Sequence, residues 1–444
     1  MNKTDKSTLA NQLLAGVDQS GPRCRPVNHV IIDEGWLIHI LPWKQNVTFN
    51  VILDQHCTYV QKLAHSAQCQ VIFDGYSTSI KDHEHTRRSE GKTHCNVLVQ
   101  LDTVNKYDRD KFLLNTENKA RFIGLLADRL RRDGHTVTTC PGDADVHHYC
   151  QGGSAFNAEN GSVDVVCTDT DKPFPDRSRV RTSGSIVFRK EPQRHNPKTG
   201  GRYSVEDICE SLHPAQTEAL LSLHCWSGCG STSGFYGHGK LELFKKVNRS
   251  AKLQKIARQM GESNSSDDIG QLGVQLASFQ YGDGDFGADL SGLRYSKFCE
   301  IVAKCSKFDP RVLPPTPRAI HFHSLHCHLQ LVRWKHLDDS LLGETEWGWT
   351  KSRNRFEPMP TDMAVAPASA LNFIRCKCKK KLENKCGNNL CSCKKHGLKC
   401  LEACAGCHGR DCLNHEKERQ VDSDDASDSG AGEEDEEIHK QPHF

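Results

Sequence analysis

Four short apolar or β-branched segments lead into aspartates, and this repeated pattern constrains the fold more than any other feature. The segments and the acidic residues that follow them are Val30–Ile32 with Asp33, Val71–Phe73 with Asp74, His135–Cys140 with Asp143 and Asp145, and Val163–Cys167 with Asp169 and Asp171. Helical apolar spacing lies between the segments, at Phe49–Ala67 and at Thr116–Arg132. Strands that alternate with helices predict an α/β domain with a mainly parallel sheet.

The predicted topology indicates where the aspartates lie relative to the sheet. Ligands of open α/β sheets bind beyond the carboxyl ends of the strands, where all six of these side chains are expected. Carboxylates gathered at one edge repel one another unless a hard divalent cation neutralises them, and Mg²⁺ or Mn²⁺ prefers such oxygen ligands. Two such ions about 3.5–4 Å apart are suited to phosphodiester hydrolysis. The alternative for each aspartate is a turn or a helix N-cap.

The C-terminal region carries a second pattern. Nine of the 22 cysteines lie in one basic segment, at positions 376, 378, 386, 391, 393, 400, 404, 407 and 412. Thiolates at these spacings favour tetrahedral Zn²⁺, and nine sulfurs hold three ions if three of them bridge. The segment has too few large apolar residues to stabilise a fold by itself, so metal binding would supply the folding energy. A disordered cysteine-rich tail or a redox segment is the alternative.

The same end of the chain consists of a basic segment followed by an acidic one. Residues 375–412 hold ten Lys or Arg and three acidic residues, whereas residues 416–437 hold eleven acidic and two basic residues. A basic module beside an acidic tail indicates a nucleic-acid partner and a disordered end. The first residues lack a secretory signal and no segment has the length of a membrane span, so we expect an intracellular protein.

Several motifs together resemble a known superfamily. IIDEG (31–35), VIFDGY (71–76), GDAD (142–145), TDTD (168–171) and GCGST (228–232) resemble the PIN-like fold of flap endonucleases. KDHEHTRR (81–88) and HCWSGCGSTSGFYGHGK (224–240) look like an uncharacterised, transposon-derived group of animal proteins. The resemblance implies that Asp33, Asp74, Asp143, Asp145, Asp169 and Asp171 hold two Mg²⁺ or Mn²⁺ ions that cleave DNA or RNA.

The chain departs from this superfamily at two places. The last acidic residue of the superfamily lies in a Gly-Cys-Asp motif, but this chain has Gly230 at that position, and Lys172–Pro175 replaces an apolar helical run. Both departures predict a weakened or inactive site.

The cysteine segment resembles the CXC module of the tesmin/TSO type, whose members carry three zinc ions on nine cysteines and often bind DNA. The second half of the segment fits this pattern more loosely, and Leu390 stands where the module usually has a DNA-reading aromatic residue. Expected phosphate contacts in the module are Lys377, Lys379, Lys380, Lys381, Lys394 and Lys395.

Basic residues outside the cysteine module are also candidates for nucleic-acid contact. Lys81, Arg87 and Arg88 lie in the first of the two longer motifs, and Lys240 follows the glycine-rich turn of the second. The alternatives are a solvated helix face for the first group and a surface lysine on a tight turn for Lys240. The histidines between His321 and His328 are interpreted as surface residues of an amphipathic helix rather than as metal ligands.

These observations predict an order of regions along the chain. The expected boundaries are a polar lead (1–26), a PIN-like domain (27–248), a helical region (249–342), a linker (343–372), a CXC zinc module (373–415) and an acidic tail (416–444). Three functions stay open: a metal-dependent nuclease, a catalytically inactive DNA- or chromatin-binding protein, and an interaction scaffold. DNA or RNA partners favour a nuclear location, with chromatin proteins as further candidate partners.

Overall fold

The computed structural model divides the chain into two compact units, residues 1–276 with 321–360 and residues 277–320 with 361–444. Within them, the structure describes residues 7–17, 26–73, 96–140, 162–167, 185–190, 200–262, 265–282, 289–304, 309–336, 342–352, 355–363, 375–378, 386–395, 398–401, 404–410 and 412–415. Each unit is described by itself.

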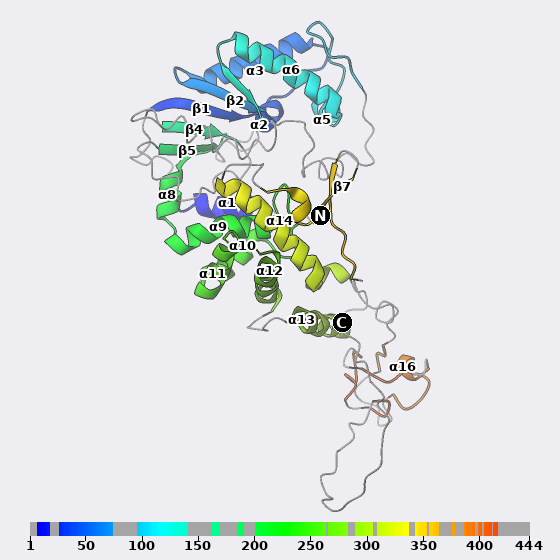
Figure 1. Ribbon diagram of the computed structural model, residues 1–444. Helices are drawn as coiled ribbons and strands as arrows, with labels where there is room; N and C mark the ends of the chain where they lie inside the picture. Colours follow the sequence, from blue (N-terminus) through cyan, green and yellow to red (C-terminus); the bar gives the residue numbers. More distant parts are fainter. Residues whose placement is uncertain are drawn as a thin grey trace, which may run out of the picture. The chain divides into compact units, whose positions relative to one another are not determined.

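A six-stranded, mainly parallel sheet forms the first half of the first unit (Figure 1). Its strands are β1 (Val27–Asp33), β2 (Gln68–Phe73), β3 (Thr136–Thr139), β4 (Ser162–Val166), β5 (Ser185–Lys190) and β6 (Gly201–Ser204). The spatial order is β3-β2-β1-β4-β5-β6, and only β6 is antiparallel to its neighbour. The predicted α/β class with a parallel sheet is therefore confirmed.

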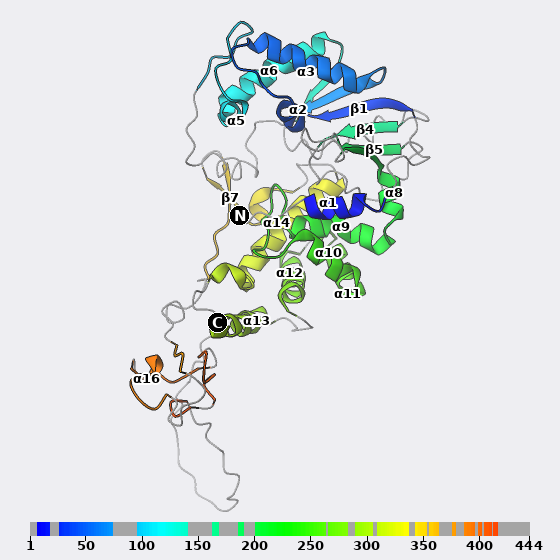
Figure 2. The ribbon, with the colours of Figure 1, turned by 180° about the vertical axis from the view of Figure 1, so that it is seen from behind.

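Helices cover one face of this sheet, as both ribbon views show for α3 and α6 (Figure 2). The helices of this half are α2 (Glu34–Ile40), α3 (Phe49–Ala64), α5 (Arg109–Leu113) and α6 (Thr116–Arg132). Asn115 caps α6 by accepting hydrogen bonds from Glu117 and Asn118, and three arginines in the last turn complement the helix dipole.

The sheet is buried on both sides. Ile32, Val71 and Phe73 belong to the large core beneath α3 and α6. Ile31 and Ile72, which alternate with them along the same two strands, belong to a smaller cluster on the other face. A strand buried on both faces is a continuous apolar run in the sequence, which is why the central strands could be predicted.

Helices complete the first unit. They are α1 (Ser7–Leu14), α8 (Val205–Glu210), α9 (Pro214–Trp226), α10 (Lys240–Asn248), α11 (Ala251–Gln259), and parts of α12 (Ser266–Tyr281) and α14 (Pro317–His336). A short break separates α8 from α9, because α8 ends at Glu210 and Pro214 begins α9 with His213 as its cap. The polar lead contains α1, whose Leu9 and Ala10 are buried.

The segment expected to be a linker contains regular structure between residues 344 and 358. The short helix η3 (Glu344–Glu346) precedes an antiparallel hairpin of β7 (Trp349–Ser352) and β8 (Arg355–Pro358). Trp347, Trp349 and Phe356 are buried in a core with Phe322 and Leu329 of α14.

The second unit contains α13 (Leu290–Lys304), the short helix η2 (Pro310–Val312) and the cysteine-rich module with α16 (Ser392–Lys395). No helix among the described residues combines the length and apolar character needed to cross a membrane.

Candidate functional site

The carboxyl ends of four parallel strands meet at one edge of the sheet. Asp33 of β1 pairs with Ile72 of β2, and Phe73 at the end of β2 pairs with Thr139 of β3. On the other side, Ile32 of β1 pairs with Val166 at the end of β4. The four strands thus end within one or two residues of one another, as the sequence pattern requires.

The predicted acidic residues follow these ends. Asp33 lies within the described residues, whereas Asp74, Asp143, Asp145, Asp169 and Asp171 lie outside them. Asp74 directly follows Phe73, the last residue of β2. The structure therefore brings together the strand ends, and the metal-ligand role of the six carboxylates stays a prediction.

Asp33 is a half-buried N-cap of α2. Its Oδ2 atom accepts a hydrogen bond from the backbone N–H of Trp36 at 3.1 Å. The helix N-cap role, which was the alternative to metal binding for each aspartate, is thus observed for Asp33. A carboxylate has about four acceptor positions, so capping α2 is compatible with binding a cation.

A charged pair that the sequence did not indicate lies beside Asp33. Glu34 is fully buried, and its Oε1 atom lies 3.5 Å from the ammonium nitrogen of Lys119 on α6. The two residues are 85 positions apart, and nothing in their local sequences signals the contact. The pair fixes a positive charge on α6 close to the start of α2.

Lys240 differs from its predicted role as an exposed phosphate contact. Its side chain is 2% exposed, and its ammonium group donates hydrogen bonds to the His224 carbonyl at 2.8 Å and to the Ser227 hydroxyl at 3.2 Å. These bonds tie the start of α10 to the end of α9. The lysine therefore has an internal structural role, and the alternative of a surface lysine is wrong as well.

Exposed basic residues follow Lys240 on the next two helices. A two-residue connection joins α10 to α11, and their outer surface carries Lys245, Arg249, Lys252, Lys255 and Arg258, all exposed. The apolar residues of both helices, including Leu243, Val247 and Ile256, are buried. We refer to these five residues as the basic helix pair. Their spacing of three or four residues is the signal in the sequence that indicates one exposed basic face.

The other expected contacts divide into described and undescribed residues. Lys377, Lys394 and Lys395 are exposed on the cysteine-rich module, and Leu390 is 88% exposed. Lys81, Arg87, Arg88, Lys379, Lys380 and Lys381 lie outside the described residues.

All nine cysteines of the C-terminal module converge on a common centre. Eight are buried and Cys378 is partly buried. The sulfur of Cys376 lies 3.7 Å from Cys386, 3.9 Å from Cys400 and 3.7 Å from Cys407, and Cys393 lies 3.5 Å from Cys404. Four sulfurs about 2.3 Å from one tetrahedral Zn²⁺ are separated by about 3.8 Å. The spacing therefore fits thiolates around a metal.

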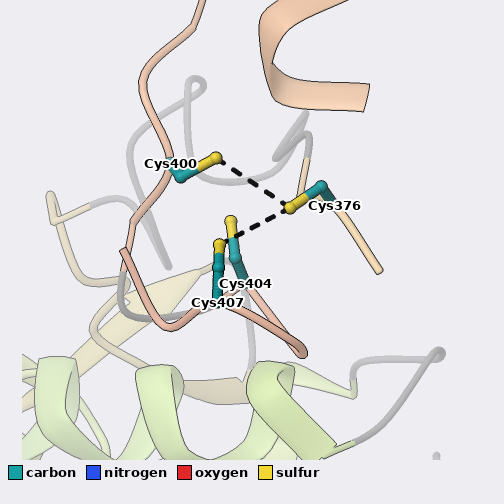
Figure 3. Close-up of side chains that lie close together, drawn as sticks. All are labelled: Cys376, Cys400, Cys404 and Cys407. Atoms are coloured by element: carbon teal, nitrogen blue, oxygen red, sulfur yellow. Dashed lines mark hydrogen bonds between the residues drawn. The ribbon is translucent and has the colours of Figure 1, made fainter. Parts of the chain in front are cut away.

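The sulfurs form four overlapping quartets. Their members are Cys376, Cys378, Cys386 and Cys391; Cys376, Cys391, Cys393 and Cys400; Cys376, Cys400, Cys404 and Cys407; and Cys386, Cys400, Cys407 and Cys412. Figure 3 shows the third quartet, with Cys376 facing both Cys400 and Cys407. Cys376 and Cys400 each belong to three quartets, so these two are the leading candidates for bridging ligands.

Burial and crowding act against free thiolates at Cys376, Cys393 and Cys400, whereas at Cys391 hydrogen bonds from the Lys394 backbone and neighbouring cysteines outweigh burial and lower the pKa to about 7. Burial raises the pKa of the Cys376 and Cys400 thiols far above the usual range, and burial with the neighbouring Cys404 raises the pKa of Cys393 to about 12. A metal ion that binds here must displace protons, which makes its affinity pH-dependent.

The histidine tract forms a helix, as predicted, but three of its four histidines are buried, and only His321 is partly exposed. His323 Nε2 lies 2.9 Å from the Trp226 carbonyl, and His326 Nε2 lies 2.7 Å from the Gly348 carbonyl. His328 Nδ1 contacts the Met260 carbonyl at 2.8 Å, and all three rings are buried. These polar rings face carbonyl groups of distant segments, which local amphipathicity cannot predict.

Comparison with known proteins gives likeness in structure alone. No protein-family model matches the sequence, and no curated protein matches it. The catalytic core of Rad2 in complex with a DNA substrate is 16% identical, with a TM-score of 0.35 over 66% of this chain and 92% of that one. A bacteriophage T5 flap endonuclease complex with DNA and metal ions is 15% identical, with a TM-score of 0.37 over 70% of this chain and 90% of that one.

The Holliday junction-resolving enzyme GEN1, in complex with product DNA and a Mg²⁺ ion, is 13% identical, with a TM-score of 0.30 over 75% of this chain and 77% of that one. Of these three neighbours, one is a flap endonuclease, one resolves Holliday junctions, and all three are in complex with DNA. Because each TM-score lies below 0.5, the roles of individual residues have to come from the geometry of this chain.

Proposed function

We propose that this chain is a nucleic-acid-binding protein built on a metal-dependent phosphodiesterase scaffold, joined to a zinc-bound module of the CXC type. The observation that carries the proposal is the register of the sheet. Four parallel strands end together at one edge; β1 ends on Asp33, and one or two aspartates follow each of the other three strands in the sequence. This is the edge at which open α/β sheets bind ligands.

The donor set fits a hard divalent cation. Asp33, Asp74, Asp143, Asp145, Asp169 and Asp171 offer carboxylate oxygens, which suit Mg²⁺ or Mn²⁺. When bound, such ions supply activation of water and stabilisation of the leaving oxygen. Of the chain's own residues, Asp33 is held in place by its cap on α2, which fixes the orientation of at least this carboxylate.

Nucleic acid would contact the basic helix pair and the exposed lysines of the cysteine-rich module. The helix pair has five exposed positive charges on adjacent turns, and Arg258 also pairs weakly with Glu218 and Glu262 at 3.8 Å and 3.6 Å. Such a surface attracts phosphates without reading sequence, so binding should weaken steeply with salt.

The second candidate is a catalytically inactive DNA- or chromatin-binding protein. Gly230 favours it, because no carboxylate stands at the position where the resembled superfamily has its last acidic residue. In this case the scaffold and the zinc module would hold nucleic acid without cleaving it. Either function agrees with a nuclear location.

Cleavage assays with flap, single-stranded and duplex substrates in Mg²⁺ or Mn²⁺ separate the two candidates. The variant Asp33→Asn with Asp169→Asn should abolish cutting, and since Asn caps helices as well as Asp, α2 should stay intact. Asp128→Asn, an exposed aspartate on α6 paired with Arg131, is the matched control and should cut normally.

The outcomes differ clearly. Metal-dependent cutting that the double variant loses would establish the enzyme. An inactive wild type whose Gly230→Asp variant cuts would establish a decayed site and support the second candidate. Cutting that survives in the double variant would refute the proposed carboxylate site.

Native mass spectrometry tests the metal module. Nine sulfurs that share twelve ligand positions bind three zinc ions, so we expect a mass increase of three zinc ions that chelation removes. A full-length chain that retains no zinc would contradict the assignment.

A further inference from the structure

A buried amide lies at the C-terminal end of the cysteine cluster. Asn414 follows Cys412, the last of the nine cysteines, by two residues and is 8% exposed. A buried polar side chain needs hydrogen-bond partners, because leaving it without them costs free energy. The partners of Asn414 therefore indicate what this residue does.

The backbone and the side chain of Asn414 both bond to the segment that contains Cys400. The backbone N–H of Cys400 donates to the Asn414 carbonyl at 2.7 Å, and Nδ2 of Asn414 donates to the Leu398 carbonyl at 2.8 Å. A carbonyl can only accept, so the atom that faces Leu398 has to be the nitrogen, and the orientation of the amide is fixed. The two bonds join residues 398–401 to residues 412–415.

The same nitrogen also faces a sulfur. Nδ2 of Asn414 lies 3.4 Å from the Sγ atom of Cys400 and donates an N–H···S hydrogen bond to it. An amide nitrogen has two hydrogens, so it can donate to the Leu398 carbonyl and to the sulfur at once. The side chain therefore offers the Cys400 sulfur a neutral donor that is held in place by a second bond.

Cys400 is a central member of the cluster. It belongs to three of the four quartets, and its sulfur lies 3.9 Å from that of Cys376, which it faces in Figure 3, and 3.8 Å from that of Cys391. A thiolate that serves more than one ion has to keep one orientation toward all of them. Hydrogen bonds from residues that do not touch the metal set the orientation and the donor strength of metal ligands.

We propose that Asn414 is a positioning residue of the zinc module. Its side-chain N–H orients the Cys400 thiolate toward the quartets that share this sulfur and draws negative charge away from it. The inference rests on the proposed zinc module and adds to the nine cysteines a tenth residue that tunes one of them. It implies that the Cys400 sulfur is less reactive toward electrophiles than its neighbours.

The alternative is that Asn414 only ties two loops together. Loss of such a tie would loosen the C-terminal end of the cluster and would expose Cys400, Cys404 and Cys407 alike. Loss of the N–H···S hydrogen bond would act on Cys400 before the other two. Trypsin cuts after Lys399 and Arg410 and releases all three cysteines in one peptide, so their relative reactivity can be measured within it.

Competitive alkylation of the zinc-loaded full chain measures this reactivity. Brief treatment with iodoacetamide labels the reactive sulfurs, the chain is then unfolded with a chelator, and isotopically heavy iodoacetamide labels the remaining sulfurs before digestion. Cys400 is 4% exposed, compared with 0% for Cys404 and 1% for Cys407, so exposure alone would make Cys400 react first. We expect the opposite order in the wild type, with Cys400 labelled last.

Asn414→Leu removes the donor, keeps a side chain of similar size and adds no charge. It should raise the labelling of Cys400 relative to Cys404 and Cys407 by about three- to tenfold, the factor that corresponds to one hydrogen bond. With cobalt(II) in place of zinc, the thiolate-to-metal charge-transfer bands of this variant should move to longer wavelength, because the sulfur lone pairs lose a stabilising donor. Asn389→Leu, the same change at an exposed asparagine of the module, should alter neither readout.

Three results would overturn the role of Asn414. They are a wild type in which Cys400 is labelled first, an equal rise at all three cysteines in zinc-loaded Asn414→Leu, and an unchanged cobalt spectrum in that variant. The wild-type order decides the case even where Asn414→Leu binds too little metal for a spectrum. Native mass spectrometry separates this failure from that of the proposed function, since a wild type without zinc would refute the zinc module itself.

Discussion

Acidification should destabilise the first unit through two buried histidines of α14. His323 and His326 are each 8% exposed, and their Nε2 atoms contact the carbonyls of Trp226 and Gly348. Burial lowers the pKa of both rings to about 4, although the carbonyl contacts oppose the shift. Both rings are therefore neutral in the folded protein at neutral pH.

The direction of the pH dependence of stability follows from proton binding. An unfolded histidine has a pKa of about 6.5, so between pH 6.5 and pH 4 the unfolded chain binds protons that the folded chain excludes. Stability is fully present above pH 6.5 and is lost as the pH falls toward 4. At pH 5.0 each ring costs about 2 kcal/mol, so the pair lowers the free energy of unfolding by about 4 kcal/mol relative to pH 7.5. That is a large part of the stability of an ordinary domain.

Urea unfolding followed by tryptophan fluorescence measures this loss. The chain's six tryptophans are Trp36, Trp43, Trp226, Trp334, Trp347 and Trp349. All of them belong to the first unit, so the signal does not report on the cysteine cluster of the second. Near pH 5.25 we expect a slope of at least roughly 2 kcal/mol per pH unit.

Substitution isolates the contribution of the two rings. His323→Gln with His326→Gln removes both titrations, so this variant should lose about 4 kcal/mol less than the wild type between pH 7.5 and 5.0, whatever its stability at pH 7.5. His65→Gln, at an exposed histidine after α3, should keep the wild-type dependence. An unchanged pH dependence in the double variant would refute the reasoning.

Three further changes test other parts of the structure. Gly228→Ala should lower the free energy of unfolding by about 2–4 kcal/mol, because a left-handed φ combines with a backbone clash, whereas Gly237→Ala, at φ +77° with open space around it, should cost about 1 kcal/mol in the same urea titration. Asp164→Asn should cost about 1–3 kcal/mol, since the buried carboxylate accepts a hydrogen bond from the partly exposed Arg202 guanidinium at 2.7 Å; unchanged stability would count against a stabilising ion pair. Chelation of zinc should speed proteolysis of residues 375–415 and leave the first unit's fluorescence unchanged; equal cleavage rates with and without metal would contradict a metal-held fold.

The sheet was predictable because its signals are local. The central strands are buried on both faces and are therefore continuous apolar runs, and α6 has the bounds Thr116–Arg132 that its apolar spacing predicts. The inner strand β5 and the edge strand β6 were not predicted. Ser185–Lys190 mixes apolar and basic residues, and Gly201–Ser204 has only four residues, so neither carries a clear alternation.

The side chains that the sequence misassigned depend on distant partners. His323, His326 and His328 are polar residues whose acceptors are carbonyls of segments 22 to 97 positions away. The cysteine quartets could be predicted, because close spacing along the chain already restricts the sulfurs to a small volume. Spacing does not decide which sulfurs bridge, since Cys376 reaches Cys407 only through the folding of the intervening loops.

Lys240 and the basic helix pair allow a structural role of a positive charge to be separated from the proposed role in binding nucleic acid. Lys240→Met would leave the His224 carbonyl and the Ser227 hydroxyl without their buried donor, so we expect a loss of about 1–3 kcal/mol in stability and no change in the salt dependence of DNA binding. Lys245→Gln with Arg249→Gln removes only exposed charges. That variant should unfold within about 0.5 kcal/mol of the wild type, and its slope of log affinity against log salt should fall by about two. If the Lys240 variant changed the salt slope and the exposed pair did not, phosphates would be reaching the buried lysine, and the basic helix pair would lose its assigned role.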